Sequence, residues 1–316
     1  MGKATAKTEL FATWKQGSLV VADEGQSTGA RFWVKSTGSD TTGYGRAPDK
    51  PFASLDYAST QCTASAGDII YVMEGHAETI IGATGSNLAV AGVRVVGLGA
   101  GANRPTYTFT TANAATMTVD AANVTIENLL FVCSKDGQTA MLDVNADDCT
   151  VRRCELRADD TYQPATFIDL TSAAANGGDR LTVEDCIILS LTAGATQGIE
   201  LGEVNDGVIL RHNWIYGDFT AAGIHNPTGK VLTRLLIENN YVANLNSGNH
   251  AIELVSACTG MCVGNRLYGD TIGTILDPGS LFCNDNYEVD AIDQSGVPTP
   301  ATPAVAQFDS TDFGAN

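Results

Sequence analysis

The sequence predicts an all-β solenoid, a right-handed parallel β-helix of about eight or nine coils, and three observations lead to this fold class. A nine-residue phrase recurs seven times, apolar residues alternate within each copy, and a second short apolar stretch precedes the copies. Repeats of this length are typical of solenoids, in which each repeat buries its apolar face only against its neighbours.

The recurring phrase has the pattern of a short, half-buried strand. Its copies begin at positions 123, 148, 180, 207, 234, 260 and 280, and a weaker copy begins at Gly92. The second and fourth places are apolar or Cys throughout, as in Val124 and Ile126, and such alternation is typical of a strand. Stacked amides form ladders at turns. A ladder is therefore predicted at the seventh place, which holds Cys154, Cys186, Asn213, Asn240 and Asn286.

The stretch before each phrase predicts a second strand with one outward position between two apolar ones. That position holds Thr118, Asp143, Asp169, Glu200, His225 and Glu253. Successive coils lie about 4.8 Å apart, so stacked carboxylates repel and their proton affinity rises unless water, a cation or a basic partner intervenes.

Three interpretations of these acids stay open. Two of them, such as Asp143 with Asp169 or Asp169 with Glu200, match the spacing of a glycosidase pair. The set also suits Ca²⁺ or a basic protein surface. The third interpretation is a solvated polar face, and we assign no catalytic residue and no metal site from the sequence.

Composition limits the classes of partner. The chain has 316 residues and a formal net charge of −18, with only 18 Lys and Arg, so charge does not favour nucleic acid or an anionic membrane. No apolar run has the length of a membrane span, and the N-terminus lacks the apolar core of a signal peptide. The eight Cys include no CxxC pair, which predicts buried, reduced thiols in a protein made in a cytoplasm. No cofactor is expected.

The chain divides into three predicted parts. Residues 1–31 form an N-terminal arm, residues 32–290 the β-helix, and residues 291–316 a C-terminal arm rich in Pro, Ala and Thr. An amphipathic helix near residues 51–63 is expected to cap the first coil, because a solenoid must cover its open edges. Terminal arms normally become ordered only when they are anchored to another surface. We therefore expect an assembly in which the arms contact other subunits.

The stretch "GSDTTGYGRAPDKPFASLDYA", followed by "GDIIYVMEGHAETI", resembles the entry segment of the pectate-lyase-like β-helix superfamily. It is most similar to the small β-helix virion proteins of tailed bacteriophages. The resemblance covers about residues 32–81, and the coils extend it to about residue 290. The polygalacturonase motifs of the superfamily are missing, and the nearest candidates for a lyase base, Arg152 and Arg153, belong to the first strand of their coil.

The resemblance implies a non-enzymatic virion protein, most simply a capsid decoration or cement protein made in the host cytoplasm. Its expected partners are the major capsid protein or other virion subunits, contacted through the arms, and a homotrimer is expected. The alternative is a polysaccharide-degrading or glycan-binding tail spike or fibre protein, because this fold serves several functions.

The eighth place of the phrase predicts an aromatic stripe. It holds Leu130, Trp214, Tyr241, Leu267 and Tyr287. If these residues face outward, Trp214, Tyr241 and Tyr287 form a contact ridge, for which packing against a neighbour or a terminal arm is favoured over stacking on sugars.

Overall fold

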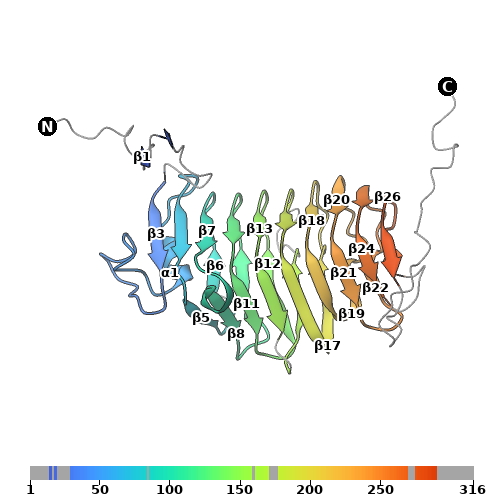
Figure 1. Cartoon of the computed structure of the whole chain (residues 1–316), viewed down its shortest axis with the longest axis horizontal. Coiled ribbons are helices and arrows are strands. Elements are labelled where there is room, and N and C mark those ends of the chain that lie inside the picture. The colour runs from blue at the N-terminus through green and yellow to red at the C-terminus, as the bar shows by residue number, and fades with distance from the viewer. Residues whose placement is uncertain are drawn as a thin grey trace.

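The computed structural model describes residues 14–15, 18–19, 29–83, 85–158, 161–170, 177–269 and 275–289. Its body is an elongated solenoid in which short strands stack side by side along one axis (Figure 1). All strand pairs of this body are parallel, and eight successive turns within the described part contribute a strand to each of three faces. The predicted parallel β-helix is therefore confirmed.

The first face is a ten-stranded sheet in which the recurring phrase supplies the eight strands from β7 onward. In order along the axis its strands are β3 (Arg31–Val34), β4 (Ile69–Val72), β7 (Arg94–Gly97), β10 (Thr125–Glu127), β13 (Thr150–Arg152), β16 (Thr182–Glu184), β18 (Ile209–Arg211), β20 (Leu235–Glu238), β23 (Gly260–Val263) and β26 (Phe282–Asn284).

The second face follows the first after a sharp corner. Its strands are β5 (Ala77–Ile80), β8 (Thr106–Phe109), β11 (Leu130–Cys133), β14 (Glu155–Ala158), the first parts of β17 (Ile187–Glu200) and β19 (Trp214–Asn226), β21 (Tyr241–Asn244), β24 (Arg266–Tyr268) and β27 (Tyr287–Val289).

The third face closes each turn. It contains β6 (Ser86–Leu88), β9 (Met117–Val119), β12 (Gln138–Val144), β15 (Pro164–Asp169), the last parts of β17 and β19, β22 (His250–Leu254) and β25 (Leu276–Asp277). A separate antiparallel pair, β1 (Trp14–Lys15) and β2 (Ser18–Leu19), lies in the segment predicted as the N-terminal arm.

The recurring phrase spans two strands rather than one, because a residue with positive φ bends it after its fifth residue. Asn128, for example, has a φ of 57° and separates β10 from β11. Asn and Asp tolerate this left-handed conformation better than most residues, and Gly adopts it without a steric penalty because it has no Cβ. The same corner is made by Arg153, Asp185, His212, Asn239, Gly264 and Asp285.

The interior is a continuous apolar stack along the axis. One column on the first face consists of register partners that are at most 1% exposed, and each buried aliphatic side chain contributes about 1.5–3 kcal/mol. Its members include Val95, Ile126, Val151, Val183, Leu210, Ile237 and Cys262. All eight Cys are free thiols, and all except Cys62 are buried, as the sequence predicts.

A buried amide ladder lines the corner between the first and second faces. It comprises Asn213, Asn240, Asn265 and Asn286, with Cys154 and Cys186 continuing the same inward position. The ladder predicted from the seventh place is confirmed. Asn265 was missed because the copy that begins at Gly260 reaches its corner one residue early, at Gly264.

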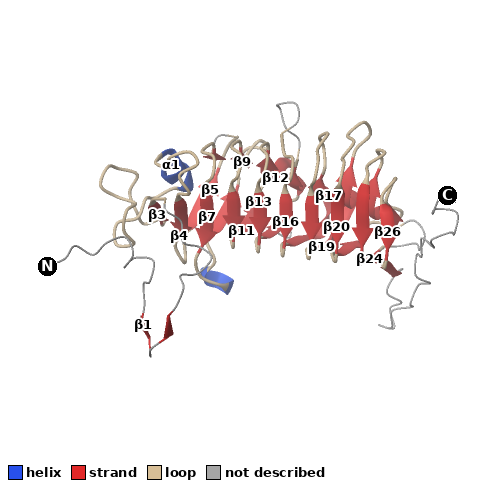
Figure 2. Ribbon diagram, turned by 90° about the horizontal axis from the view of Figure 1, so that it is seen from above, coloured by secondary structure: helices blue, strands red, loops and turns tan. Residues whose placement is uncertain are grey.

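Helix α1 (Leu55–Thr60) covers the N-terminal edge of the third face (Figure 2). The Ser59 hydroxyl donates to the carbonyl of Asn87 at 3.0 Å, and the Asn87 N–H donates to the Asp56 carboxylate at 3.1 Å. The helix is shorter than the predicted 51–63, because Ser54 is its N-cap and Phe52 forms a β-bridge with Val34 instead. The remaining helical turn is the 3₁₀ element η1 (Gly101–Asn103).

The sequence predicts two terminal arms and no membrane span. The C-terminal arm and most of the N-terminal arm lie outside the described residues. Among the residues that are described, no helix has the length and apolar character needed to cross a membrane.

Candidate functional site: an acidic column and an aromatic ridge

The acidic residues predicted to share one outward position do form a single column on the third face. Each is the direct register partner of the next across one turn of the solenoid. The acidic column consists of Asn87, Thr118, Asp143, Asp169, Glu200, His225, Glu253 and Asp277. Asn87 and Asp277 were not among the predicted members, because the strands that carry them are the short terminal members of the face.

Amide side chains donate hydrogen bonds to two carboxylates in the centre of the column. Asn145 donates to Asp143 at 3.1 Å, and the same amide donates to Asp120 at 3.0 Å. Gln197 donates both to Glu200 and to Thr166, the second at 3.1 Å.

Burial raises the pKa of Asp143 above its usual value, and the nearby charge of Asp120 adds to this effect. The hydrogen bond from Asn145 favours the ionised form and opposes the shift. Asp169 is the most buried acid of the column, with 6% of its surface exposed, and it lies between Asp143 and Glu200 in register. The centre of the column therefore holds carboxylates in a partly desolvated row.

Two of the four His residues of the chain contact one carboxylate near the end of the column. His225 Nε2 lies 3.5 Å from Glu253 Oε2, and His250 Nδ1 lies 3.6 Å from Glu253 Oε1. His76, by contrast, is buried in the first turn and contacts Glu78 at 3.1 Å. His76 therefore lies apart from the acidic column.

The arginines nearest to the acids in sequence face away from the column. Arg152 and Arg153 both bind Glu127 on the first face, each at 2.9 Å. Within the described residues, no Lys or Arg forms an ion pair with Asp143, Glu200 or Glu253. The same part of the chain contains no group of three or more His, Cys, Asp or Glu arranged to hold a metal ion.

The predicted aromatic stripe lies on the outer surface of the second face. Trp214, Tyr241 and Tyr287 are 54%, 36% and 56% exposed, and we call these three residues the aromatic ridge. The rings of Trp214 and Tyr241 are 5.0 Å apart and inclined by 46°. The register column continues through Ile187 on one side and includes Arg266 between the two tyrosines.

Two residues of the predicted stripe are not part of the exposed ridge. Leu267 is 1% exposed and belongs to the interior, because the early corner at Gly264 shifts its copy by one residue and places Arg266 outward. Leu130 occupies an outward register position two turns before Ile187 but is buried.

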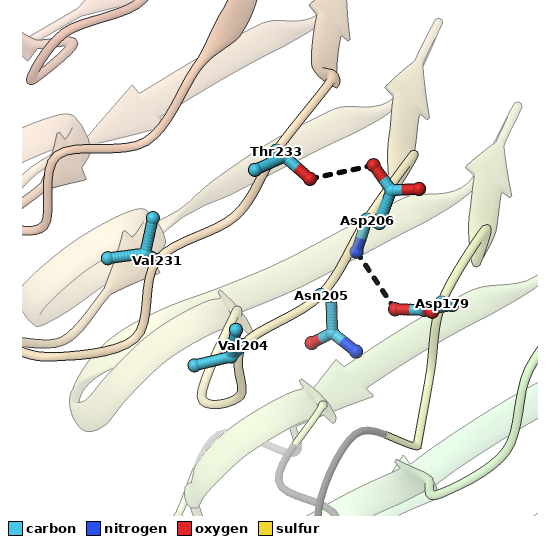
Figure 3. A pocket seen from close by; sticks show the side chains of 6 residues that line it. All are labelled: Asp179, Val204, Asn205, Asp206, Val231 and Thr233. Atoms are coloured by element: carbon cyan, nitrogen blue, oxygen red, sulfur yellow. Dashed lines mark hydrogen bonds between the residues drawn. The ribbon is translucent and has the colours of Figure 1, made fainter.

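A shallow pocket lies where the third face turns into the first (Figure 3). Thr233 donates from its hydroxyl to Asp206 at 2.7 Å, and the N–H of Asp206 donates to Asp179 at 2.9 Å. Arg234 also pairs with Asp206. The acids of this pocket thus already have partners, and Val204 and Val231 supply its apolar part.

Comparisons with known proteins bear on the fold. No protein-family model matches the sequence, and no curated protein matches it. Among solved structures, pectate lyase Pel9A superposes with a TM-score of 0.63 at 13% identity, over 82% of this chain and 69% of that one. A rhamnogalacturonan lyase gives a TM-score of 0.45 at 10% identity, over 82% and 87%. The first of these similarities shows that the chain has the pectate-lyase-like parallel β-helix fold.

Proposed function

We propose that this chain is a non-enzymatic structural protein that docks the outer surface of its second face onto another protein. The aromatic ridge carries the proposal. Trp and Tyr are enriched among the residues that contribute most to protein–protein binding. Here Trp214 and Tyr241 lie exposed on adjacent turns of the solenoid, and Tyr287 lies exposed two turns further along the same column.

The distribution of charged residues also favours this surface as the docking site. From Ile187 to Tyr287 the outward column contains no Asp or Glu, and neither does the column beside it, although the chain carries 36 acids. That second column consists of Leu189, Tyr216, Ala243, Tyr268 and Val289. A partner can therefore approach these two columns without meeting a carboxylate.

The assembly we propose is a bacteriophage virion, in which the chain is a decoration or cement protein on the capsid surface. The similarity of the entry segment to small phage β-helix proteins supports this assignment. The major capsid protein is the proposed partner, and a homotrimer is the proposed form, with the terminal arms adding contacts. A symmetric lattice would hold many copies, so that each contact can be weak.

The test uses capsids from a phage that encodes this chain, with its gene deleted. Added wild-type protein should saturate the capsids at a fixed copy number. The double variant Trp214→Ser, Tyr241→Ser should bind about tenfold more weakly or worse, since one interface hot spot contributes about 2 kcal/mol. Val255→Ser, which removes an exposed apolar residue directly after β22 on the third face, is the matched control. Equal binding of the double variant, or no binding of the wild type, would reject the proposal.

Polysaccharide cleavage or binding is the second candidate, and the acidic column favours it. Asp143, Asp169 and Glu200 lie on adjacent turns. Neighbouring strands are about 4.8 Å apart, close to the carboxylate separation of about 5–5.5 Å in retaining glycosidases. The wild-type protein would be incubated with neutral and uronic-acid polysaccharides while new reducing ends and unsaturated products are measured. Cleavage that disappears in Asp169→Asn and Glu200→Gln variants of intact fold would establish this candidate, whereas an inactive wild type would remove the catalytic version.

A further inference from the structure

Three arginines converge on one carboxylate on the first face, remote from the aromatic ridge and the acidic column. Arg94 Nη2 and Arg152 Nη2 donate to Glu127 Oε2 at 2.7 and 2.9 Å, and Arg153 Nη1 donates to Glu127 Oε1 at 2.9 Å. We call these four residues the arginine cluster. Its members come from three adjacent turns, because Arg94, Glu127 and Arg152 lie on β7, β10 and β13.

The arginine cluster carries a net positive charge. Three cations and one anion leave +2, in a chain whose formal net charge is −18. The neighbouring acid Glu184 does not offset this, because Arg211 donates to it twice, at 2.9 and 2.6 Å. In register, the outward residues alternate in charge from Glu127 through Arg152, Glu184 and Arg211 to Glu238, and Arg94 and Arg153 stand outside this alternation.

The cluster also has hydrogen-bond donors to spare. Each guanidinium has five N–H donors, and Glu127 accepts one from each of the three arginines. The Nε atoms of Arg94 and Arg152 are buried and have no partner in the structure. The side chain of Arg153 is 60% exposed, so the cluster opens to solvent on its side.

Glu127 fixes the arginines in place. Burial tends to raise the pKa of this carboxyl, but the hydrogen bonds and charges of Arg94 and Arg152 outweigh burial and lower it. Glu127 is therefore ionised at neutral pH and holds three guanidinium groups close together despite their mutual repulsion. Such a preorganised set of planar donors suits a tetrahedral oxyanion, which it can bind through charge-assisted hydrogen bonds.

We propose that the arginine cluster is a binding site for a sulfate or phosphate group, which enters beside Arg153 and is held by Arg94, Arg152 and Arg153. The group could be a free ion or a substituent of a larger molecule, because both present the same oxygens. This site does not depend on the proposed docking function, since it lies on a different face.

Isothermal titration calorimetry of the full chain with sodium sulfate, against sodium chloride at equal ionic strength, tests the site. Saturable binding specific to sulfate is expected. The double variant Arg94→Gln, Arg153→Gln should lower the affinity about tenfold or more, because it removes two positive charges and their charge-assisted hydrogen bonds to the anion. Arg234→Gln, which removes an arginine paired with Asp206 elsewhere, should bind sulfate like the wild type. Absence of saturable binding, or equal loss in both variants, would overturn the proposal.

The variant Glu127→Gln separates a ligand site from a purely structural cluster. Removing the carboxylate raises the local charge to +3 and leaves the three guanidinium groups without their anion, so sulfate should replace it and raise the melting temperature of this variant more than it raises that of the wild type. In a structural cluster the variant would be destabilised without any specific rescue by sulfate, and that result would also overturn the proposal. If Glu127→Gln does not fold, sulfate titration of the Arg94/Arg153 double variant against Arg234→Gln still tests the proposed site. A sulfated oligosaccharide that binds more tightly per sulfate group than the free ion would indicate a group carried on a larger molecule.

Discussion

The side-chain oxygen of Asn240 accepts two hydrogen bonds from Asn213, one turn away, from its backbone N–H and from its side-chain amide, each at 3.0 Å. The amide nitrogen of Asn240 in turn donates to the carbonyl of Leu210 at 2.9 Å and to the next ladder member, Asn265, at 3.0 Å. One buried side chain thus bonds to polar groups on the turns on both sides of its own.

Replacing Asn240 by Ala should therefore lower the free energy of unfolding by about 2–4 kcal/mol, because the donors of Asn213 and the carbonyl of Leu210 lose a buried partner. Denaturant unfolding followed by circular dichroism measures the loss. Asn284→Ala is the control, since this exposed Asn bonds only to Asp285 at 3.3 Å, and it should change stability by less than about 0.5 kcal/mol. Equal effects of the two substitutions would contradict a stabilising ladder.

Much of the fold could be predicted from the sequence, because the inward positions repeat with an apolar or Cys side chain even where no residue is identical. The register of the acidic column followed from the same alternation: Asp143, Asp169 and Glu200 each lie between two apolar residues in sequence. The third strand of each turn was harder to predict. The strand in question is that of the second face, which is separated from the first-face strand by a residue with positive φ such as Arg153 or His212. Arg and His do not indicate a positive φ in the sequence as Gly does.

The functional surfaces were predicted less completely. A single early corner at Gly264 exchanged Leu267 for Arg266 on the aromatic stripe, and no periodicity rule reveals a one-residue slip of this kind. The arginine cluster escaped sequence reasoning because Arg94 and Glu127 are separated by 33 positions and meet only through stacking of adjacent turns. Contacts across turns require the register, which sequence spacing alone gives only approximately.

Asp143→Asn should stabilise the protein at neutral pH. The pKa of Asp143 is raised in the folded state, so folding disfavours its ionised form. The native protein binds more protons than the unfolded chain between the ordinary Asp pKa of 3.8 and the raised pKa, and stability falls as pH rises through that window. The gain from the substitution should thus be present at pH 7 and vanish below about pH 3.8, as thermal melts across pH would show.

Asp206→Asn should show the opposite pH dependence and so serves as a contrast. Its hydrogen bonds with Arg234 and then Thr233 lower the pKa of Asp206 to about 2. Its ionised form stabilises the fold above the ordinary Asp pKa of 3.8, and this contribution is lost as pH falls toward 2. The substitution should therefore destabilise slightly at pH 7 and have no effect near pH 2. The same sign for Asp143→Asn and Asp206→Asn at pH 7 would refute this electrostatic account.

The thiols of the native protein should react slowly with a disulfide reagent at pH 8. The thiolate is the reacting form, and burial raises the pKa of Cys62 to about 12 and that of Cys149 to about 11. Cys283 should react first, since a hydrogen bond from Cys262 lowers the pKa of Cys283. Absorbance of the released thiol should show slow native labelling, loss of its fastest phase in Cys283→Ala, and eight reactive thiols in the unfolded wild type. Rapid labelling of several native thiols would show that the core opens readily.

Asp68 should be essential for the N-terminal end of the solenoid. It is 2% exposed, and its two carboxylate oxygens accept the backbone N–H groups of Ala30, at 2.5 Å, and Thr63, at 2.7 Å. It thereby joins the entry to β3 with the segment that follows α1. Asp68→Ala leaves both N–H groups without an acceptor and should cost about 2–5 kcal/mol, whereas Asp68→Asn keeps one acceptor and should cost about half as much.

Hydrogen exchange distinguishes this role from a general loss of stability. In Asp68→Ala, amides of β3 and α1 should exchange faster than in the wild type, while those of β20 and β21 keep their protection, because each turn of a solenoid contacts only its neighbours. Uniform acceleration along the whole chain would mean that the solenoid unfolds as one unit, and that Asp68 stabilises the entire fold rather than its first turn.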